Sequence, residues 1–133
     1  MQTFLPYPCF KKSLQCLDYR RLGKQRVEAF QLLKSIKDSN YSWAKHPASK
    51  MWKKFPEALK LYMNMAIIEW KNRGYNNTMK LEKINWKKFK LPDWFGNQKF
   101  HSAHRSNLLR KDYIFYSKNN WKEDTKQEYF WPV

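Results

Sequence analysis

The stretch from Leu17 to Ala29 constrains the fold of this chain more than any other. From this stretch onward, apolar residues recur with the 3.6-residue period of an α-helix. They are Leu22, Ala29, Phe30, Leu33 and Ile36. Asp18 precedes them and is a residue type that accepts hydrogen bonds from the free amides of a helix start. We therefore predict a first long helix, capped by Asp18 and running to about Ile36, with one buried face.

The solvent face of this predicted helix is cationic. It carries three cations and one carboxylate: Arg20, Arg21, Lys24 and Glu28. An acid among cations suits a site that processes DNA, but it also suits a solvated helix in which Glu28 pairs with Lys24 one turn away. Arg26 falls on the inner face, where a buried arginine needs a carboxylate or several carbonyls as partners, so it is expected to be structural or to reach into a cleft. Spacing alone leaves these interpretations open.

Prolines and glycines divide the remainder of the chain. Pro6 and Pro8 lack an amide donor, so residues 1–10 are expected to form an extended arm. The aromatic residues 129–133 are expected to pack on the domain, since exposing them to water is costly. Further helices are predicted over residues 47–54, 55–74 and 100–111. The expected fold is all-α: a compact single domain of residues 1–133, with about three main helices, an extended N-terminal arm and an aromatic C-terminal tail.

The segment between Tyr75 and Lys99 is predicted to be the least regular part of the chain. Lysines alternate there with large apolar residues, and Pro92 and Gly96 mark turns. One interpretation is a loop that faces DNA. The other is a loop whose aromatic side chains cover the core while lysine stems lie over them. The pattern favours neither.

The charge balance predicts a polyanionic partner. Lys and Arg number 27 against 11 Asp and Glu, which gives a net charge of +16. Cations that neutralise phosphates release condensed counterions, and the seven Trp and eight Tyr are suited to stacking on bases. The alternative is a protein from a lysine-rich proteome. No apolar run is long enough to span a membrane, and residues 1–10 lack the apolar segment of a signal peptide, so we expect a cytoplasmic monomer, in a bacterial cell or, if viral, in a host cell or virion.

Few groups in this sequence are suited to chemistry. His101 and His104 lie one helical turn apart, and with Cys9 and Cys16 they could form a four-ligand zinc site. They could equally bond phosphate or backbone near a helix start, and we predict no metal and no cofactor. Phosphate-binding loops and catalytic cysteine or serine motifs are missing, and the acids are scattered. What remains for metal-free DNA chemistry is Glu28 and an amine, either a lysine or the chain's α-amino group, whose unperturbed pKa is about 8.

Several blocks of the chain resemble the pyrimidine-dimer DNA glycosylase (endonuclease V) family, in its small bacterial and viral branch. The resemblance extends over nearly the whole chain. The blocks are Met1–Tyr7, Cys16–Ala29, Glu69–Trp70 with Arg73–Tyr75, His101–Asp112 and Trp131–Val133. It implies an all-α domain in which an N-terminal arm passes between helices to the active site. It also implies base-excision repair of damaged double-stranded DNA, which the family bends and from which it flips a base.

The resemblance also implies a mechanism. An N-terminal amine attacks the sugar C1′ of a damaged pyrimidine to give a Schiff base, and a glutamate supports this attack and the β-elimination (AP lyase) step that nicks the strand. No metal is required. The family's Tyr-Arg-Glu-Leu-Pro-Arg aligns with Tyr19 to Lys24, so Arg21 takes the position of that glutamate. Glu28 lies two turns further along the same face, and we predict that it is the replacement.

The site prediction follows from this alignment. Methionine is usually kept before a large residue such as Gln2, so the predicted nucleophile is the Met1 amine, or otherwise a lysine such as Lys24. The predicted catalytic residues are Met1 and Glu28. The predicted DNA-binding residues are Arg20, Arg21, Lys24, Arg26, His101, His104, Arg105, Arg110 and Lys111. Two alternatives stay open: a non-catalytic DNA-binding or packaging protein on the same fold, and an RNA-binding module.

Overall fold

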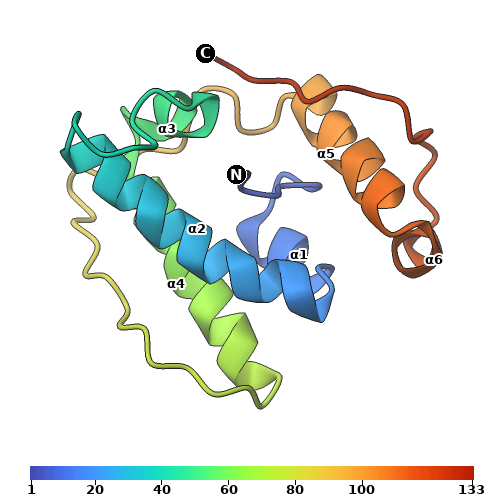
Figure 1. Ribbon diagram of the computed structural model, residues 1–133, viewed down its shortest axis with the longest axis horizontal. Helices are drawn as coiled ribbons and strands as arrows, with labels where there is room; N and C mark the ends of the chain where they lie inside the picture. Colours follow the sequence, from blue (N-terminus) through green and yellow to red (C-terminus); the bar gives the residue numbers. More distant parts are fainter.

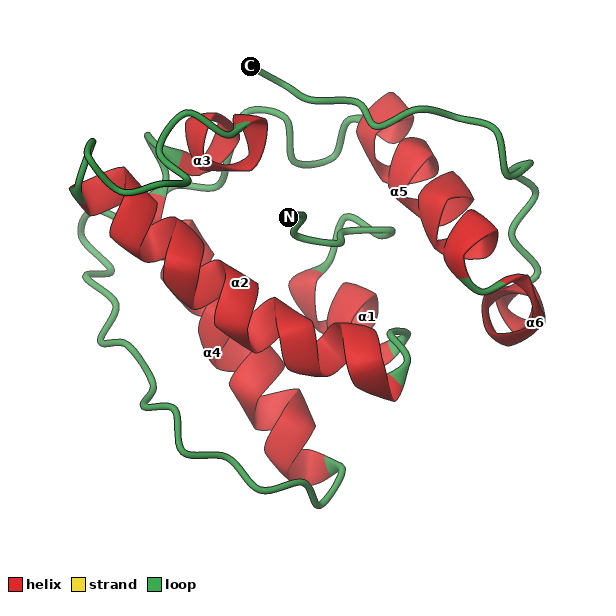
Figure 2. Ribbon diagram, viewed as in Figure 1, coloured by secondary structure: helices red, strands yellow, loops and turns green.

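The computed structural model describes residues 1–133 and is all-α, without strands (Figure 2). Its three long helices are α2 (Tyr19–Lys37), α4 (Pro56–Asn72) and α5 (Gln98–Lys111). The short elements are α1 (Phe10–Gln15), α3 (Pro47–Trp52), α6 (Tyr113–Tyr116) and the 3-10 helix η1 (Ser117–Asn119). The prediction of an all-α fold with about three main helices is therefore confirmed. None of these helices is both long and apolar enough to cross a membrane.

The long helices enclose the beginning of the chain. Figure 1 shows α2 lying across α4 on one side of the molecule and α5 on the other, with the N-terminal arm between them. Buried side chains from all three sides meet around this arm, among them Leu5, Leu22, Tyr62 and Phe100, each 0% exposed. The C-terminal tail runs back along α5, and its Tyr129, Phe130 and Trp131 pack against the core as expected.

Helix α2 begins where the sequence predicts. The Asp18 side chain accepts a hydrogen bond from the Arg21 amide at 3.4 Å, and the helix ends at Lys37, one residue past the predicted end. Its buried face differs in one position from the prediction. Phe30 is 39% exposed and lies under the Lys34 ammonium, while Leu32 and Leu33 are the buried residues of this turn. Phe30 therefore belongs to the edge of the apolar stripe.

Most other boundaries shift by one or two residues. Helix α4 ends at Asn72, and Gly74 adopts a φ of 88° just beyond it, as expected of a C-terminal glycine. Phe10, the last residue of the expected extended arm, begins α1. The segment after α4 contains no regular element before α5, as predicted, yet its backbone is fixed by side chains of α4.

Gly23 gives α2 room for a ring. The neighbour there is Trp70: a Cβ at residue 23 would lie 3.0 Å from its Cζ3. The indole is fixed on several sides. Tyr19 stacks on it at 5.4 Å and 19°, the Arg26 guanidinium lies 4.2 Å from its centroid, and its Nε1 donates to the Asn76 carbonyl at 2.7 Å. Trp70 therefore occupies the gap that the glycine leaves between Tyr19 and Arg26.

Gly23→Ala is expected to destabilise the protein, although alanine favours a helix by about 1 kcal/mol over glycine. The added methyl group requires Trp70 to move, and overpacking of this kind costs about 1–3 kcal/mol. We expect a net loss of about 1 kcal/mol, measured as a lower urea midpoint with an unchanged m-value. A variant more stable than the parent would show that Trp70 moves freely.

Candidate active site

The N-terminal arm is tied down at nearly every residue. Leu5 is held by two imidazoles from α5: its N–H donates to His104 Nδ1 at 2.8 Å, and its carbonyl lies 2.7 Å from His101 Nδ1. His101 Nε2 accepts from the Gly96 N–H at 2.9 Å, so Nδ1 carries the proton and donates to Leu5. Both histidines are 0% exposed. Three of their four ring nitrogens bond backbone, the other option considered for them, while His104 Nε2 has no partner. A DNA contact by either histidine stays a prediction.

The zinc arrangement does not form either. Cys9 Sγ accepts from the Lys12 amide at the start of α1, and the Cys16 thiol donates to the Ser13 carbonyl. The structure brings no three His, Cys, Asp or Glu side chains together in a way that could hold a metal. The two cysteines therefore form hydrogen bonds with backbone groups at the two ends of α1.

Arg105 also anchors the arm. Its Nη1 donates to the Pro6 carbonyl at 2.7 Å, while Nε and Nη2 bond the Glu123 carboxylate at 2.9 and 2.8 Å. Its guanidinium therefore joins the arm to the C-terminal tail, and a DNA contact by Arg105 stays a prediction. Arg110 donates to the carbonyls of the tail residues Thr125 and Gln127, each at 3.0 Å, but is otherwise exposed. A DNA contact by Arg110 stays a prediction.

Gln25 is the residue that joins the arm to α2, and sequence reasoning missed it. Its side chain is 1% exposed and satisfied at both ends. Oε1 accepts from the Phe4 N–H at 2.8 Å and lies 2.6 Å from the Tyr62 hydroxyl. Nε2 donates to the Gln2 carbonyl at 2.9 Å and to Glu28 Oε2 at 3.1 Å. A polar residue within the apolar stripe between Leu22 and Ala29 was the available signal.

His104 keeps the arm bonded only while it is neutral. Burial, together with the neighbouring His101, lowers the pKa of His104 to about 3. The unfolded chain takes up this proton below its ordinary pKa of about 6.5, whereas the native state does not, so stability falls as pH drops from about 6.5 toward 3. His104 contributes about 1.4 kcal/mol of this loss per pH unit. His104→Asn keeps an acceptor in place and removes the titration, so its stability should vary less with pH between 6 and 4. An unchanged slope in urea unfolding would contradict this account.

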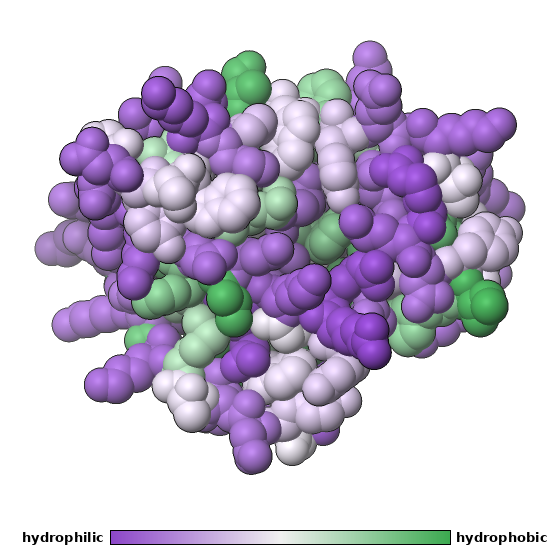
Figure 3. All heavy atoms as spheres, in the orientation of Figure 1, coloured by the Kyte–Doolittle hydropathy of each residue, from purple (hydrophilic) through white to green (hydrophobic).

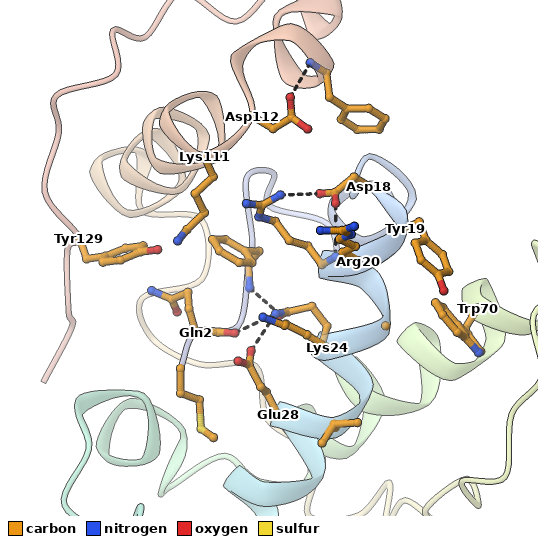
Figure 4. A pocket seen from close by; sticks show the side chains of 17 residues that line it. Gln2, Asp18, Tyr19, Arg20, Lys24, Glu28, Trp70, Lys111, Asp112 and Tyr129 are labelled. Atoms are coloured by element: carbon orange, nitrogen blue, oxygen red, sulfur yellow. Dashed lines mark hydrogen bonds and ion pairs between the residues drawn. The ribbon is translucent and has the colours of Figure 1, made fainter.

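Between α2, the arm and the end of α5 lies an open pocket of about 1420 Å³ (Figure 4). Its cations are Arg20, Arg21, Lys24 and Lys111, and its acids are Asp18, Glu28 and Asp112. Aromatic rings line it as well, with Tyr19 and Trp70 on one flank of α2 and Tyr129 on the other. Met1 and Gln2, from the start of the chain, line it too. The pocket thus brings together the start of the chain, one face of α2 and a group of cationic side chains.

Glu28 and the α-amino group of Met1 belong to this one pocket. Burial raises the pKa of the Glu28 carboxyl, and the positive charge of the Met1 amine is the largest influence opposing that rise. The Gln2 backbone amide and Lys24 act in the same direction as the amine. The predicted catalytic pair is therefore brought together by the arm, which returns across α2 at Gln25 (Figure 4).

The cations of the pocket differ in how they are engaged. Arg21, at the position of the family's glutamate, is paired with Asp18 at 3.2 Å. Arg20 and Lys24 are exposed and form no ion pair, so their charges are available to a ligand. Lys111 reaches in from α5, and burial together with Arg21 and Arg110 lowers the pKa of its amine.

Arg26 lies outside the pocket lining. Its guanidinium stacks on Trp70, and its Nη1 donates to the Asn77 Oδ1 at 2.7 Å. Arg26 is half-buried, and in place of a carboxylate or several carbonyls it has one acceptor, the amide oxygen of Asn77, while its Nε has no partner. The prediction of DNA contact is not supported by this position, because Arg26 instead supports the aromatic flank of Tyr19 and Trp70.

A half-buried acid, an amine at the chain start and unpaired cations define a site suited to nucleophilic chemistry on a polyanion. A family model described as pyrimidine dimer DNA glycosylase matches residues 1–83. The chain therefore belongs to the pyrimidine dimer DNA glycosylase family. The matched part contains the arm and all of α2 with Glu28, whereas the His101–Asp112 and Trp131–Val133 blocks lie beyond it. No curated protein and no solved structure matched the chain.

Proposed function

We propose that this protein is a DNA glycosylase with an associated AP-lyase activity, acting on pyrimidine dimers in double-stranded DNA through a Schiff base. The observation that carries the proposal is the arrangement of Met1 and Glu28. The arm brings the α-amino group into a cationic pocket that also contains the half-buried Glu28 carboxyl. Burial raises the pKa of this carboxyl, and the charge of the amine partly opposes the rise. Membership of the glycosylase family supports DNA as the substrate.

The first step is displacement of the base. The neutral Met1 amine attacks C1′, the bond from C1′ to the base nitrogen breaks, and the departing base takes up a proton. Loss of the amine protons and opening of the sugar ring give a C=N bond between the protein and C1′. Glu28 is the group placed to accept a proton from the attacking amine, and its raised pKa brings it nearer to neutral pH, where proton transfer is most effective.

The second step nicks the strand. Removal of a C2′ proton from the Schiff base expels the 3′ phosphate by β-elimination, and water then releases the enzyme. Glu28 accepts this proton as well, since it is the one pocket acid that the Gln25 amide orients toward the arm. Arg20 and Lys24 are proposed to bind the flanking phosphates, because both are exposed and free of ion pairs.

Lys111 is the alternative amine within the same mechanism. Its ammonium enters the pocket from α5, and its lowered pKa leaves more of it neutral than an ordinary lysine. A second candidate function, DNA binding without catalysis, is favoured by Arg21, which pairs with Asp18 where the family has its glutamate. Glu28→Gln would leave a purely binding protein unchanged.

Incubation with irradiated and undamaged duplexes, with and without borohydride, tests the proposal. We expect strand nicks in the irradiated duplex alone and a covalent protein–DNA adduct when borohydride reduces the Schiff base. Equal binding to both duplexes without nicks or adduct would establish the non-catalytic alternative. Damage-dependent nicking without an adduct would support the assignment of glycosylase activity but would exclude the amine mechanism.

A further inference from the structure

We propose that residues 80–91 form a second nucleic-acid-binding surface, separate from the pocket, that holds an unpaired DNA strand. None of these residues lines the pocket. The segment carries five lysines and a single acid, Glu82. In Figure 1 it runs along the outer edge of the molecule beside α4, and hydrophilic side chains project along that edge in Figure 3.

The backbone of this surface is fixed. The Asn64 side chain of α4 exchanges two hydrogen bonds with the backbone of Glu82, both at 2.8 Å. The Asn85 N–H donates to Glu57 Oε1 at 2.6 Å, and a turn follows in which the Lys88 N–H donates to the Asn85 carbonyl at 3.0 Å. A segment tied in this way presents its side chains from constant positions, which lowers the entropy cost of binding a ligand.

Its lysines are available for phosphates. Four of them, Lys80, Lys83, Lys87 and Lys88, are exposed and form no ion pair, and Lys90 reaches only an exposed Asp93 at 4.0 Å. The buried acid Glu57 is paired with Lys60 and bonded by the Asn85 amide, and Lys88 acts on it through its charge without forming an ion pair. Such a run of unpaired cations attracts a phosphate backbone and releases its counterions.

Trp86 is the feature that favours an unpaired strand. Its side chain is 64% exposed, whereas the neighbouring Phe89 is partly buried against the core. The two rings are tilted at 41° with centroids 5.1 Å apart, so Phe89 supports Trp86 from the protein side. An exposed indole between lysines is suited to stacking on a base, and only an unpaired strand offers a free base face. The two earlier interpretations of this segment thus both apply: Phe89 covers the core and Trp86 faces outward.

Anisotropy with labelled oligothymidine and with undamaged duplex of equal length tests this surface. Trp86→Ala should weaken oligothymidine binding about tenfold, Trp86→Phe should retain it, and duplex binding should change less than twofold for both. The indole is exposed, so both variants should melt like the parent. The proposal fails if Trp86→Ala binds oligothymidine normally or loses both ligands equally. If Trp86→Ala instead weakened binding to anionic phospholipid vesicles about tenfold and left oligothymidine binding unaffected, the surface would be assigned to membrane binding.

Charge removal gives an independent readout. Replacing Lys83, Lys87 and Lys88 by glutamine should lower the salt dependence of oligothymidine binding by roughly two in the log–log slope. Glutamines at three other exposed lysines, Lys45, Lys53 and Lys54, provide a control of equal charge. Equal slopes for the two triple variants would overturn the proposal. Because Trp86 and these lysines lie outside the Met1–Glu28 pocket, oligothymidine binding and strand nicking are separate readouts, and failure of the proposed catalysis and failure of this surface are distinguishable.

Discussion

Glu28→Gln is expected to reduce damage-dependent strand nicking by roughly 100-fold or more, the usual contribution of a positioned acid–base group. Glutamine has the same shape and can still meet the Gln25 amide, but it cannot accept a proton from the amine or from C2′. Nicking of an irradiated duplex under single-turnover conditions measures the effect. Glu128→Gln, which removes an exposed carboxylate outside the Met1–Glu28 pocket, is the matched control and should nick normally.

The stability of Glu28→Gln separates a catalytic role from a structural one. The folded-state pKa of Glu28 is raised, so the protonated form is favoured by folding, and this contribution is lost as pH rises through the folded pKa. At pH 7 the native carboxylate therefore costs stability, and a neutral glutamine should unfold at the same or a higher urea concentration. A variant that is both inactive and clearly less stable would show that Glu28 mainly holds the arm.

Gln25→Leu is expected to have the largest effect on stability. Leucine fits the apolar stripe of α2 but leaves the Phe4 N–H and the Gln2 carbonyl unpaired, whereas the Tyr62 hydroxyl still donates to the Phe4 carbonyl. Each buried group left unpaired costs about 1–3 kcal/mol, so the loss should be about 2–6 kcal/mol. That is a large share of the stability of a typical domain, about 5–15 kcal/mol. Urea unfolding measures it, and nicking should fall as the arm detaches.

Two variants make this result specific. Gln31 lies on the same helix, and its side chain makes no hydrogen bond in the structure. Gln31→Leu should therefore change the free energy of unfolding by less than about 0.5 kcal/mol. Gln25→Glu keeps an acceptor for the Phe4 amide but places a second acid beside Glu28 and cannot donate to Gln2. It should therefore be destabilised at pH 7 and partly recover in mild acid. A stable, active Gln25→Leu protein would mean that the arm is held without this clamp.

The bounds of the helices were predicted well because the signals for them, apolar period and capping residues, come from residues close together in the sequence. The stripe of Leu22, Ala29 and Leu33 with the Asp18 cap located α2 almost to the residue. Gly74 likewise marked the end of α4. The prediction that Phe30 is buried was wrong because Phe30 lies at the edge of the apolar stripe, where the helical period alone does not distinguish an edge position from a core position.

The site required contacts between distant residues. Leu5 bonds His104 from 99 positions away, and Phe4 bonds Gln25 from 21. The sequence does not distinguish an imidazole or guanidinium that bonds other parts of the protein from one that faces a ligand, and this is why the contacts of His101 and Arg105 with the arm were not predicted. Met1 and Glu28 were placed together by resemblance to the family, and their position in one pocket is what the fold adds.

Mapping the borohydride-trapped adduct tests the central claim most directly. The protein is reacted with an irradiated duplex in the presence of borohydride, digested, and the peptide that carries the sugar remnant is sequenced by mass spectrometry. We predict that the remnant is on the α-nitrogen of Met1, and that acetylating this amine prevents the adduct. A remnant on Lys111 or Lys24, formed equally well by the acetylated protein, would contradict the assignment of the chain start as the nucleophile.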